Sequence, residues 1–106
     1  MFANLDNSNL LDRIDLSNVN LTGVDLSNTN LKGKNLSGTI LTGTNLTNAI
    51  LTEADLTDAV LYIATLTDAN FENAILTGAM LNGTNLENAV LTNAILNCVG
   101  HHICVS

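Results

Sequence analysis

The feature that most constrains this chain is a leucine that returns every five residues from Leu11 to Leu96. A period of five matches neither the roughly 3.6 residues per turn of a helix nor the two-residue alternation of a strand. Neither element could keep these leucines on one continuous face, so each unit must contain its own bend. Phe71 is the one substitute in a column made of Leu11, Leu16, Leu21, Leu26, Leu31, Leu36, Leu41, Leu46, Leu51, Leu56, Leu61, Leu66, Leu76, Leu81, Leu86, Leu91 and Leu96.

The residues around each leucine predict where the bend lies. Hydroxyl residues usually follow the leucine, where they suit an exposed turn and can bond nearby backbone. Alanine recurs two positions before the leucine, so it should share the leucine's side of a short extended segment and fill the remaining interior. Two positions after the leucine come residue types that tolerate a positive φ: Gly23, Gly33, Gly38, Gly43, Gly78 and Gly83, with Asn18, Asn28, Asn48, Asn73, Asn88 and Asn93.

The composition indicates one aliphatic all-β domain. The chain has 106 residues, of which 46% are hydrophobic and only 3% aromatic, so packing depends on aliphatic side chains. It contains no proline, which fits a backbone whose N–H groups are nearly all needed for ladders between stacked coils. Its many Asn, Thr and Gly residues disfavour helix.

The charge limits the classes of partner. A formal net charge of −7, with Arg13, Lys32 and Lys34 as the only lysine and arginine residues, argues against nucleic-acid and anionic-membrane partners. No stretch approaches the ~20 apolar residues of a membrane span. The N-terminal residues lack a signal-peptide pattern, so the default localisation is cytoplasmic.

The units resemble the pentapeptide-repeat family, whose pattern is A-(D/N)-L-X-X. Residues 54–56 and 69–71 show the pattern directly, and 44–46 and 84–86 are related to it. The resemblance covers about residues 9 to 98 and is specific, because eighteen consecutive units keep one register. It implies a right-handed quadrilateral β-helix of about four to five coils. The four-sidedness comes from the resemblance, since hydrophobic stacking alone does not separate a coil of about 20 residues from one of about 15.

The repeat boundaries predict three segments. Residues 1–10 are out of register and should start the first coil or cap it, residues 11–98 should form the β-helix, and residues 99–106 should form a C-terminal cap or tail. Caps are expected because a solenoid leaves unpaired strand edges at both ends. Val99, Ile103 and Val105 would supply apolar contact at the C-terminal edge.

Folding the sequence at twenty residues per coil predicts four different outer faces. One face stacks Ile40, Val60 and Met80, and it carries Tyr62 and Ile63 where a hydroxyl and a glycine or asparagine are expected. We interpret this face as a contact surface for a partner protein or a second copy. The alternative is that β-branched residues simply suit an outward strand position.

The charged residues fall on other parts of the rod. Neighbouring faces should carry two acidic pairs, Glu53 with Glu72 and Asp68 with Glu87. Lys34 takes an inward position, where its stem should pack inside while its ammonium group leaves through a turn.

The tail holds the residues with recognisable site chemistry, Cys98, His101, His102 and Cys104. Three alternatives stay open: a Cys98–Cys104 disulfide that pins the cap, free thiols, or soft metal ligands. The spacing is not a standard zinc pattern, so no metal is predicted. A disulfide would indicate an oxidising compartment such as the periplasm or thylakoid lumen, against the cytoplasmic default.

No motif indicates catalysis or a cofactor. The repeat contains no histidine, phosphate-binding loop or nucleophile motif. Leucine and alanine ladders leave no pocket of ~300 Å³, so any function should lie on the outside. We predict a non-catalytic structural or protein-interaction scaffold with an unidentified protein partner, and a homodimer through a coil end or the apolar face.

The family resemblance implies an alternative function, DNA-mimic binding to DNA gyrase. A rod of this size would match ~22 Å of duplex, which carries about 13 negative charges. The net charge of −7 on this chain is well below that value.

Overall fold

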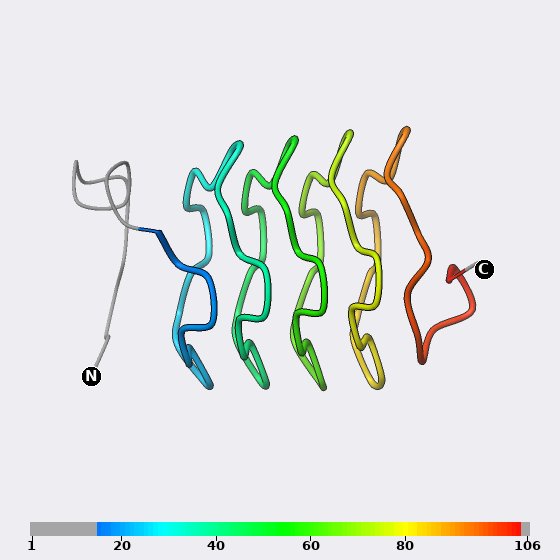
Figure 1. Cartoon of the computed structure of the whole chain (residues 1–106). Helices are drawn as coiled ribbons and strands as arrows, with labels where there is room; N and C mark the ends of the chain where they lie inside the picture. The colour runs from blue at the N-terminus through cyan, green and yellow to red at the C-terminus, as the bar shows by residue number, and fades with distance from the viewer. Residues whose placement is uncertain (1–14, 105–106) are drawn as a thin grey trace.

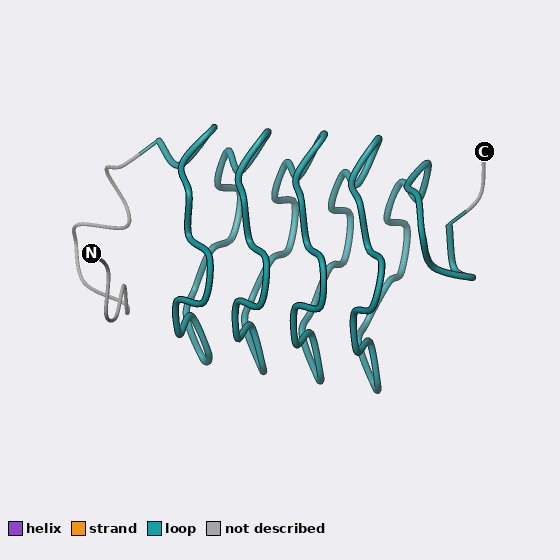
Figure 2. Cartoon of the chain, turned by 90° about the horizontal axis from the view of Figure 1, so that it is seen from below, coloured by secondary structure: helices purple, strands orange, loops and turns teal. Residues whose placement is uncertain are grey.

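The computed structural model describes residues 15–104, which wind into a stack of coils (Figure 1). Within this range the backbone forms no helix and no extended strand, and each side of a coil contributes a single bridge residue (Figure 2). Twelve isolated parallel β-bridges join residues twenty positions apart, as between Ile40 and Val60. With a turn every five residues, a coil therefore has four sides, and the predicted all-β quadrilateral architecture is confirmed.

Backbone hydrogen bonds follow the same cycle in each unit. The N–H of Leu21 donates to the carbonyl of Ile40 in the next coil at 2.7 Å. The N–H of Val24 donates back to the carbonyl of Leu21 at 3.1 Å and closes the turn. The residue before each leucine donates to the preceding coil, as Ile40 does to the carbonyl of Val19 at 2.9 Å. Each coil is thus bonded to both of its neighbours.

The N–H that follows each leucine binds a side chain where an outward Asn or Asp precedes the leucine. Oδ1 of Asp25 accepts the N–H of Ser27 at 3.0 Å and its hydroxyl at 2.6 Å. The turn hydroxyls were expected to bond backbone, but those of Thr22, Ser27, Ser37, Thr47 and Thr57 bond this side-chain oxygen. The reason is that the Asx side chain is already held beside them by the N–H. From Leu36 to Met80, at least four of the five N–H groups in each unit donate hydrogen bonds to backbone carbonyls, which fits the absence of proline.

These turn bonds also act on the carboxylates that make them. Hydrogen bonds from the hydroxyl and then the N–H of Ser27 lower the pKa of Asp25. The N–H and then the hydroxyl of Ser17 lower the pKa of Asp15. Because the folded-state pKa is depressed, the stabilisation is present above the unfolded-state pKa and is lost as the pH falls through the folded-state value. Both carboxylates are fully exposed, so we expect this contribution to be small.

Every turn from Asn18 to Asn93 places its third residue at positive φ, while the second residue is not at positive φ. This combination is typical of type II turns, whose third position favours glycine or asparagine. Glycine and asparagine fill twelve of the sixteen positions, as expected. The other four are Glu53, Asp58, Asp68 and Ile63, and the last is an outlier because a β-branched residue rarely adopts this conformation.

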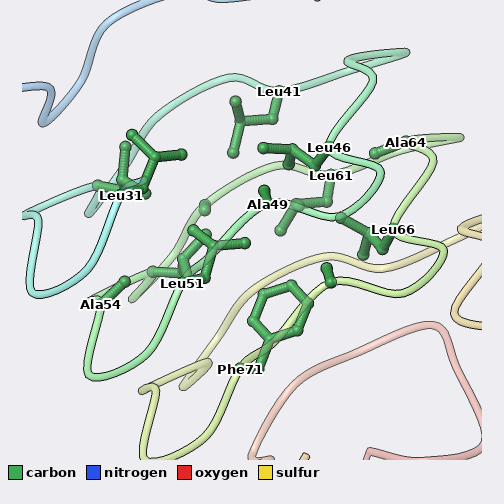
Figure 3. Close-up of a cluster of buried hydrophobic side chains, with 14 of the residues drawn as sticks. Leu31, Leu41, Leu46, Ala49, Leu51, Ala54, Leu61, Ala64, Leu66 and Phe71 are labelled. Carbon is green, nitrogen blue, oxygen red and sulfur yellow. The ribbon is translucent and has the colours of Figure 1, made fainter. Parts of the chain in front are cut away.

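The interior is a solid stack of aliphatic side chains. The leucines from Leu16 to Leu81 are at most 2% exposed, and Phe71 continues the column of Leu31 and Leu51 (Figure 3). The alanines from 49 to 79 are also buried. In the first half of the described coils, threonines replace some of these alanines, and their buried hydroxyls donate to backbone carbonyls: Thr29 to Leu26, Thr39 to Leu36, and Thr44 to Leu21 in the preceding coil.

The last coil is one residue shorter than the others. The N–H of Cys98 donates to the carbonyl of Leu96 at 2.7 Å, which closes a three-residue turn instead of a four-residue one. Val99 then bridges to Met80, nineteen positions away, and lies outward with 55% of its surface exposed. The expectation that Val99 covers the end of the stack is therefore wrong, because the missing residue moves it to an outer face.

Two of the expectations concern other parts of the chain. The predicted N-terminal coil or cap, residues 1–10, lies outside the described residues, as does Val105. Lys34 holds its inward column and is half-buried.

Candidate protein-binding surface

The residues that precede the leucines define the four sides of the stack. The apolar side consists of Ile40, Val60, Met80 and Val99, and follows Asn20 of the first described coil. The next three sides in chain order are named after Asn45, Ile50 and Asp55. The Ile50 side therefore lies opposite the apolar side. The outward residues of these three sides are Asp25, Asn45, Thr65 and Asn85; Asn30, Ile50, Asn70 and Val90; and Asn35, Asp55, Ile75 and Ile95.

The apolar side is a regular ladder fixed by the backbone. Bridges join Ile40 to Val60, Val60 to Met80 and Met80 to Val99, so the side chains repeat at the ~4.8 Å strand spacing. Ile40 is 37% exposed and Met80 is 38% exposed, while Val60 is half-buried between them. The three residues predicted for this face are thus brought together, and Val99 extends it.

The apolar residues of this side cannot accept the turn hydrogen bond that an outward Asn or Asp accepts on the other sides. On this side the N–H groups of Thr42, Tyr62 and Asn82 have no Asx oxygen to bind, and they make no other hydrogen bond within residues 15–104. A hydrogen bond of this kind contributes about 1 kcal/mol. Among the described coils, no other side lacks the Asx oxygen in three consecutive coils. Turn stability therefore does not explain the apolar residues of this side.

Tyr62 and Ile63 form the corner that joins the apolar side to the Asn45 side. The Tyr62 hydroxyl donates to the sulfur of Met80 at 2.9 Å, so its ring leans over the apolar side. Ile63 is 64% exposed at a φ of 52°, between Gly43 and Gly83 in the neighbouring coils. A Cβ on Gly83 would lie 3.0 Å from Cγ2 of Ile63, so the isoleucine occupies space that this glycine leaves open.

Replacing Ile63 by asparagine should raise the free energy of unfolding by about 1 kcal/mol. The left-handed conformation costs an ordinary L-residue roughly 1 to 2 kcal/mol, and asparagine tolerates it better. Urea denaturation followed by circular dichroism would measure the change. The reciprocal variant, Asn48→Ile at an equivalent turn, should lose a similar amount. Equal stability of Ile63→Asn and the wild type would contradict the assignment of backbone strain to this corner.

Charge is distributed unevenly around the coil. Within residues 15–104, no charged side chain lies on the apolar side or in the corner column of Tyr62 and Ile63, and only Asp58 borders the opposite edge of this side. Four of the eight acidic residues in residues 15–104 lie at the two corners of the opposite side. Backbone hydrogen bonds of 2.9 Å place Glu53 beside Glu72 and Asp68 beside Glu87, as predicted from the repeat.

A second feature is the tail at the C-terminal end. A disulfide joins Cys98 to Cys104, so two of the candidate metal ligands are not available as thiolates. Ile103 and Cys104 are partly buried and pack against the hydrophobic core. No group of three metal-ligating side chains occurs within the described part of the chain.

The tail borders a shallow groove of about 430 Å³ outside the core, lined in part by Leu86, Glu87, Leu91 and His101. Burial, followed by the charge of the neighbouring His102, lowers the pKa of His101. Nδ1 of His101 accepts the N–H of Ile103 at 3.3 Å, so this imidazole helps to shape the tail turn.

Coils of twenty residues, with four short sides around a solid leucine core, define a quadrilateral β-helix. The chain belongs to the pentapeptide-repeat family: the family model for pentapeptide repeats matches residues 2–38, 35–68 and 54–93 in 8 copies. Members of known structure adopt the right-handed form of this fold. Within residues 15–104 there is no helix that could cross a membrane.

Several solved structures are similar to this chain. HetL, a pentapeptide repeat protein involved in heterocyst differentiation regulation from the cyanobacterium Nostoc sp. strain PCC 7120, is 38% identical over 81% of this chain, with a TM-score of 0.77. Rfr23 from the cyanobacterium Cyanothece 51142 is 40% identical over 77% of this chain, with a TM-score of 0.50. A protein from the thylakoid lumen of Arabidopsis thaliana is 28% identical over 76% of this chain and covered over 67% of its own length, with a TM-score of 0.34.

This chain spans 40% of the length of HetL and 60% of that of Rfr23. No curated protein matches the chain.

Proposed function

We propose that this chain is a non-catalytic scaffold that binds another protein through the apolar side and the Tyr62–Ile63 corner. The observation that carries the proposal is the exposed, strained Ile63 beside an uninterrupted apolar ladder. Strained backbone positions persist where the surrounding structure imposes them, and they cluster at functional sites. A contiguous exposed apolar patch is typical of a protein contact. Apolar outward residues on the other sides stand singly, as Ile50 and Val90 do, or as the one pair Ile75 and Ile95.

The relatives support a role of this general class. Pentapeptide-repeat proteins are generally non-enzymatic scaffolds. HetL is described as involved in regulating differentiation, which is compatible with action through protein contacts. Since this chain spans well under half of HetL, the particular process regulated is not carried over.

Capture from native lysate tests the proposal. Immobilised wild-type chain should retain a protein, or further copies of itself, that the Val60→Asp variant does not retain, because a carboxylate at the centre of an apolar contact would be desolvated without a partner. The matched control is Ile50→Asp on the opposite side, where the replaced isoleucine is 41% exposed, and this variant should bind as the wild type does. Equal recovery by all three chains would exclude the apolar side as the binding surface.

The alternative of DNA-mimic binding to gyrase has no observation in its favour. Four of the eight acidic residues in residues 15–104 form two pairs, Glu53 with Glu72 and Asp68 with Glu87. The other four lie singly, so the coils lack the long continuous rows of charge that a duplex presents.

The disulfide bears on localisation. Disulfides persist in oxidising compartments, so Cys98–Cys104 favours the periplasm or thylakoid lumen over the cytoplasmic default. Acid-quenched thiol alkylation would test this assignment, because a reducing compartment would leave both cysteines open to labelling.

A further inference from the structure

The distribution of charge indicates what kind of protein can cover the apolar side. The whole chain carries a formal net charge of −7, and the acidic pairs flank the Ile50 side. A basic partner would be drawn to those acidic corners, away from the apolar side. An acidic partner is repelled there, but within residues 15–104 it meets no charged side chain on the apolar side except Asp58 at one edge.

A second copy of this chain meets these requirements. It is acidic, and it can present an identical uncharged ladder with the same strand spacing. Two-fold pairing of one patch with itself is the commonest way in which soluble chains associate. This inference rests on the proposed function, since both use the apolar side.

We propose that two copies pair through their apolar sides as an antiparallel dimer. The ladder has four rungs, and its centre lies between Val60 and Met80. A two-fold axis at that centre, perpendicular to the rods and lying in the plane of contact, places Val60 opposite Met80 of the second copy. The same axis places Ile40 opposite Val99 of the second copy, so every rung is covered.

The corner fits this arrangement. The axis brings the two Tyr62–Ile63 corners to the same edge of the contact, with the coil of Ile63 facing the coil of Gly83 in the second copy. Gly83 is exposed and has no side chain, but Cγ2 of Ile63 in the same copy lies beside the place of its missing Cβ. The two exposed Ile63 side chains therefore lie close to each other on either side of the axis. Two copies of one exposed apolar side chain that pack together across a two-fold axis make the contact self-complementary.

Sedimentation equilibrium of the purified, oxidised chain tests the proposal without any other protein. The wild type should show a concentration-dependent monomer–dimer equilibrium. Val60→Asp should raise the dimer dissociation constant by more than about a hundredfold, because two carboxylates meet near the axis and two apolar contacts are lost. Ile63→Asn should raise it by about tenfold while leaving the fold at least as stable, which separates a lost contact from misfolding.

Ile50→Asp, on the opposite side, should leave the dissociation constant unchanged within about twofold. A monomeric mass up to millimolar concentration would overturn the proposal, and so would a dimer that Val60→Asp and Ile63→Asn leave intact, since such a dimer would form through a coil end. If the pure chain is monomeric while lysate capture still depends on Val60, the dimer is excluded and the proposed function stands. If neither assay responds to Val60→Asp, both fail.

Discussion

Replacing Leu56 by alanine is expected to lower the free energy of unfolding by about 2 to 5 kcal/mol. Leu56 is fully buried between Leu36 and Leu76 of the same column. The ladders of hydrogen bonds hold the coils apart at the strand spacing, so the stack cannot collapse into the space that the missing atoms leave. Because small domains have only about 5 to 15 kcal/mol of stability, this one change removes a large share of it.

Urea denaturation monitored by circular dichroism measures this effect, and the chain provides its own control. Leu96 lies in the same column at the end of the stack, where it is only half-buried. Leu96→Ala should therefore cost clearly less than Leu56→Ala. Equal losses at the two positions would show that the end of the column is as tightly packed as its middle.

Reducing the disulfide should destabilise the last coil by about 2 kcal/mol, as expected for releasing a short closed loop. The bond ties Cys98, in the column of inward alanines, to Cys104 after the tail turn. No further coil is described beyond this one, so the rung of Val99 on Met80 has hydrogen bonds to a neighbouring coil on one side only. The same effect is expected for the double variant Cys98→Ser with Cys104→Ser.

Amide hydrogen exchange can locate this effect. In a solenoid, each coil contacts only its neighbours, so loss of the link should open the end without opening the rest. Exchange should accelerate at the N–H groups of Leu81 and Val99, which donate to the carbonyls of Val99 and Ala79, and stay unchanged at Leu21. The double variant should not respond to added reductant. Uniform acceleration along the chain would contradict a local role for the disulfide.

Much of the fold follows from the columns of the repeat. The five-residue leucine register, the glycine and asparagine turns and the inward alanines can all be read from residue types, because each column has one physical task. The number of sides cannot be read in this way, since every side has the same inward residues. Bridges such as Ile40–Val60 decide it, and only the family resemblance anticipated them.

The features that residue types did not predict are those in which one unit departs from its column. The three-residue turn at Leu96–Cys98 moves Val99 outward, and a single missing residue could not be assigned to this turn from the pattern. Glu53, Asp58 and Asp68 adopt positive φ because their backbone is held by coils on both sides, which overrides their weak preference. Tyr62 and Ile63 could be predicted as exceptions, because a hydroxyl residue and a glycine or asparagine are expected at their positions.

The core and the outer sides repeat at different intervals along the chain, so an insertion affects them differently. The interior repeats every five residues, whereas each outer side repeats only every twenty. Insertion of one extra pentapeptide between Val60 and Met80 would keep every leucine inside, yet it would rotate all later coils by a quarter turn. The apolar ladder would then be dislocated although the rod stayed intact. A lengthened rod can preserve its apolar side only if it grows by whole coils.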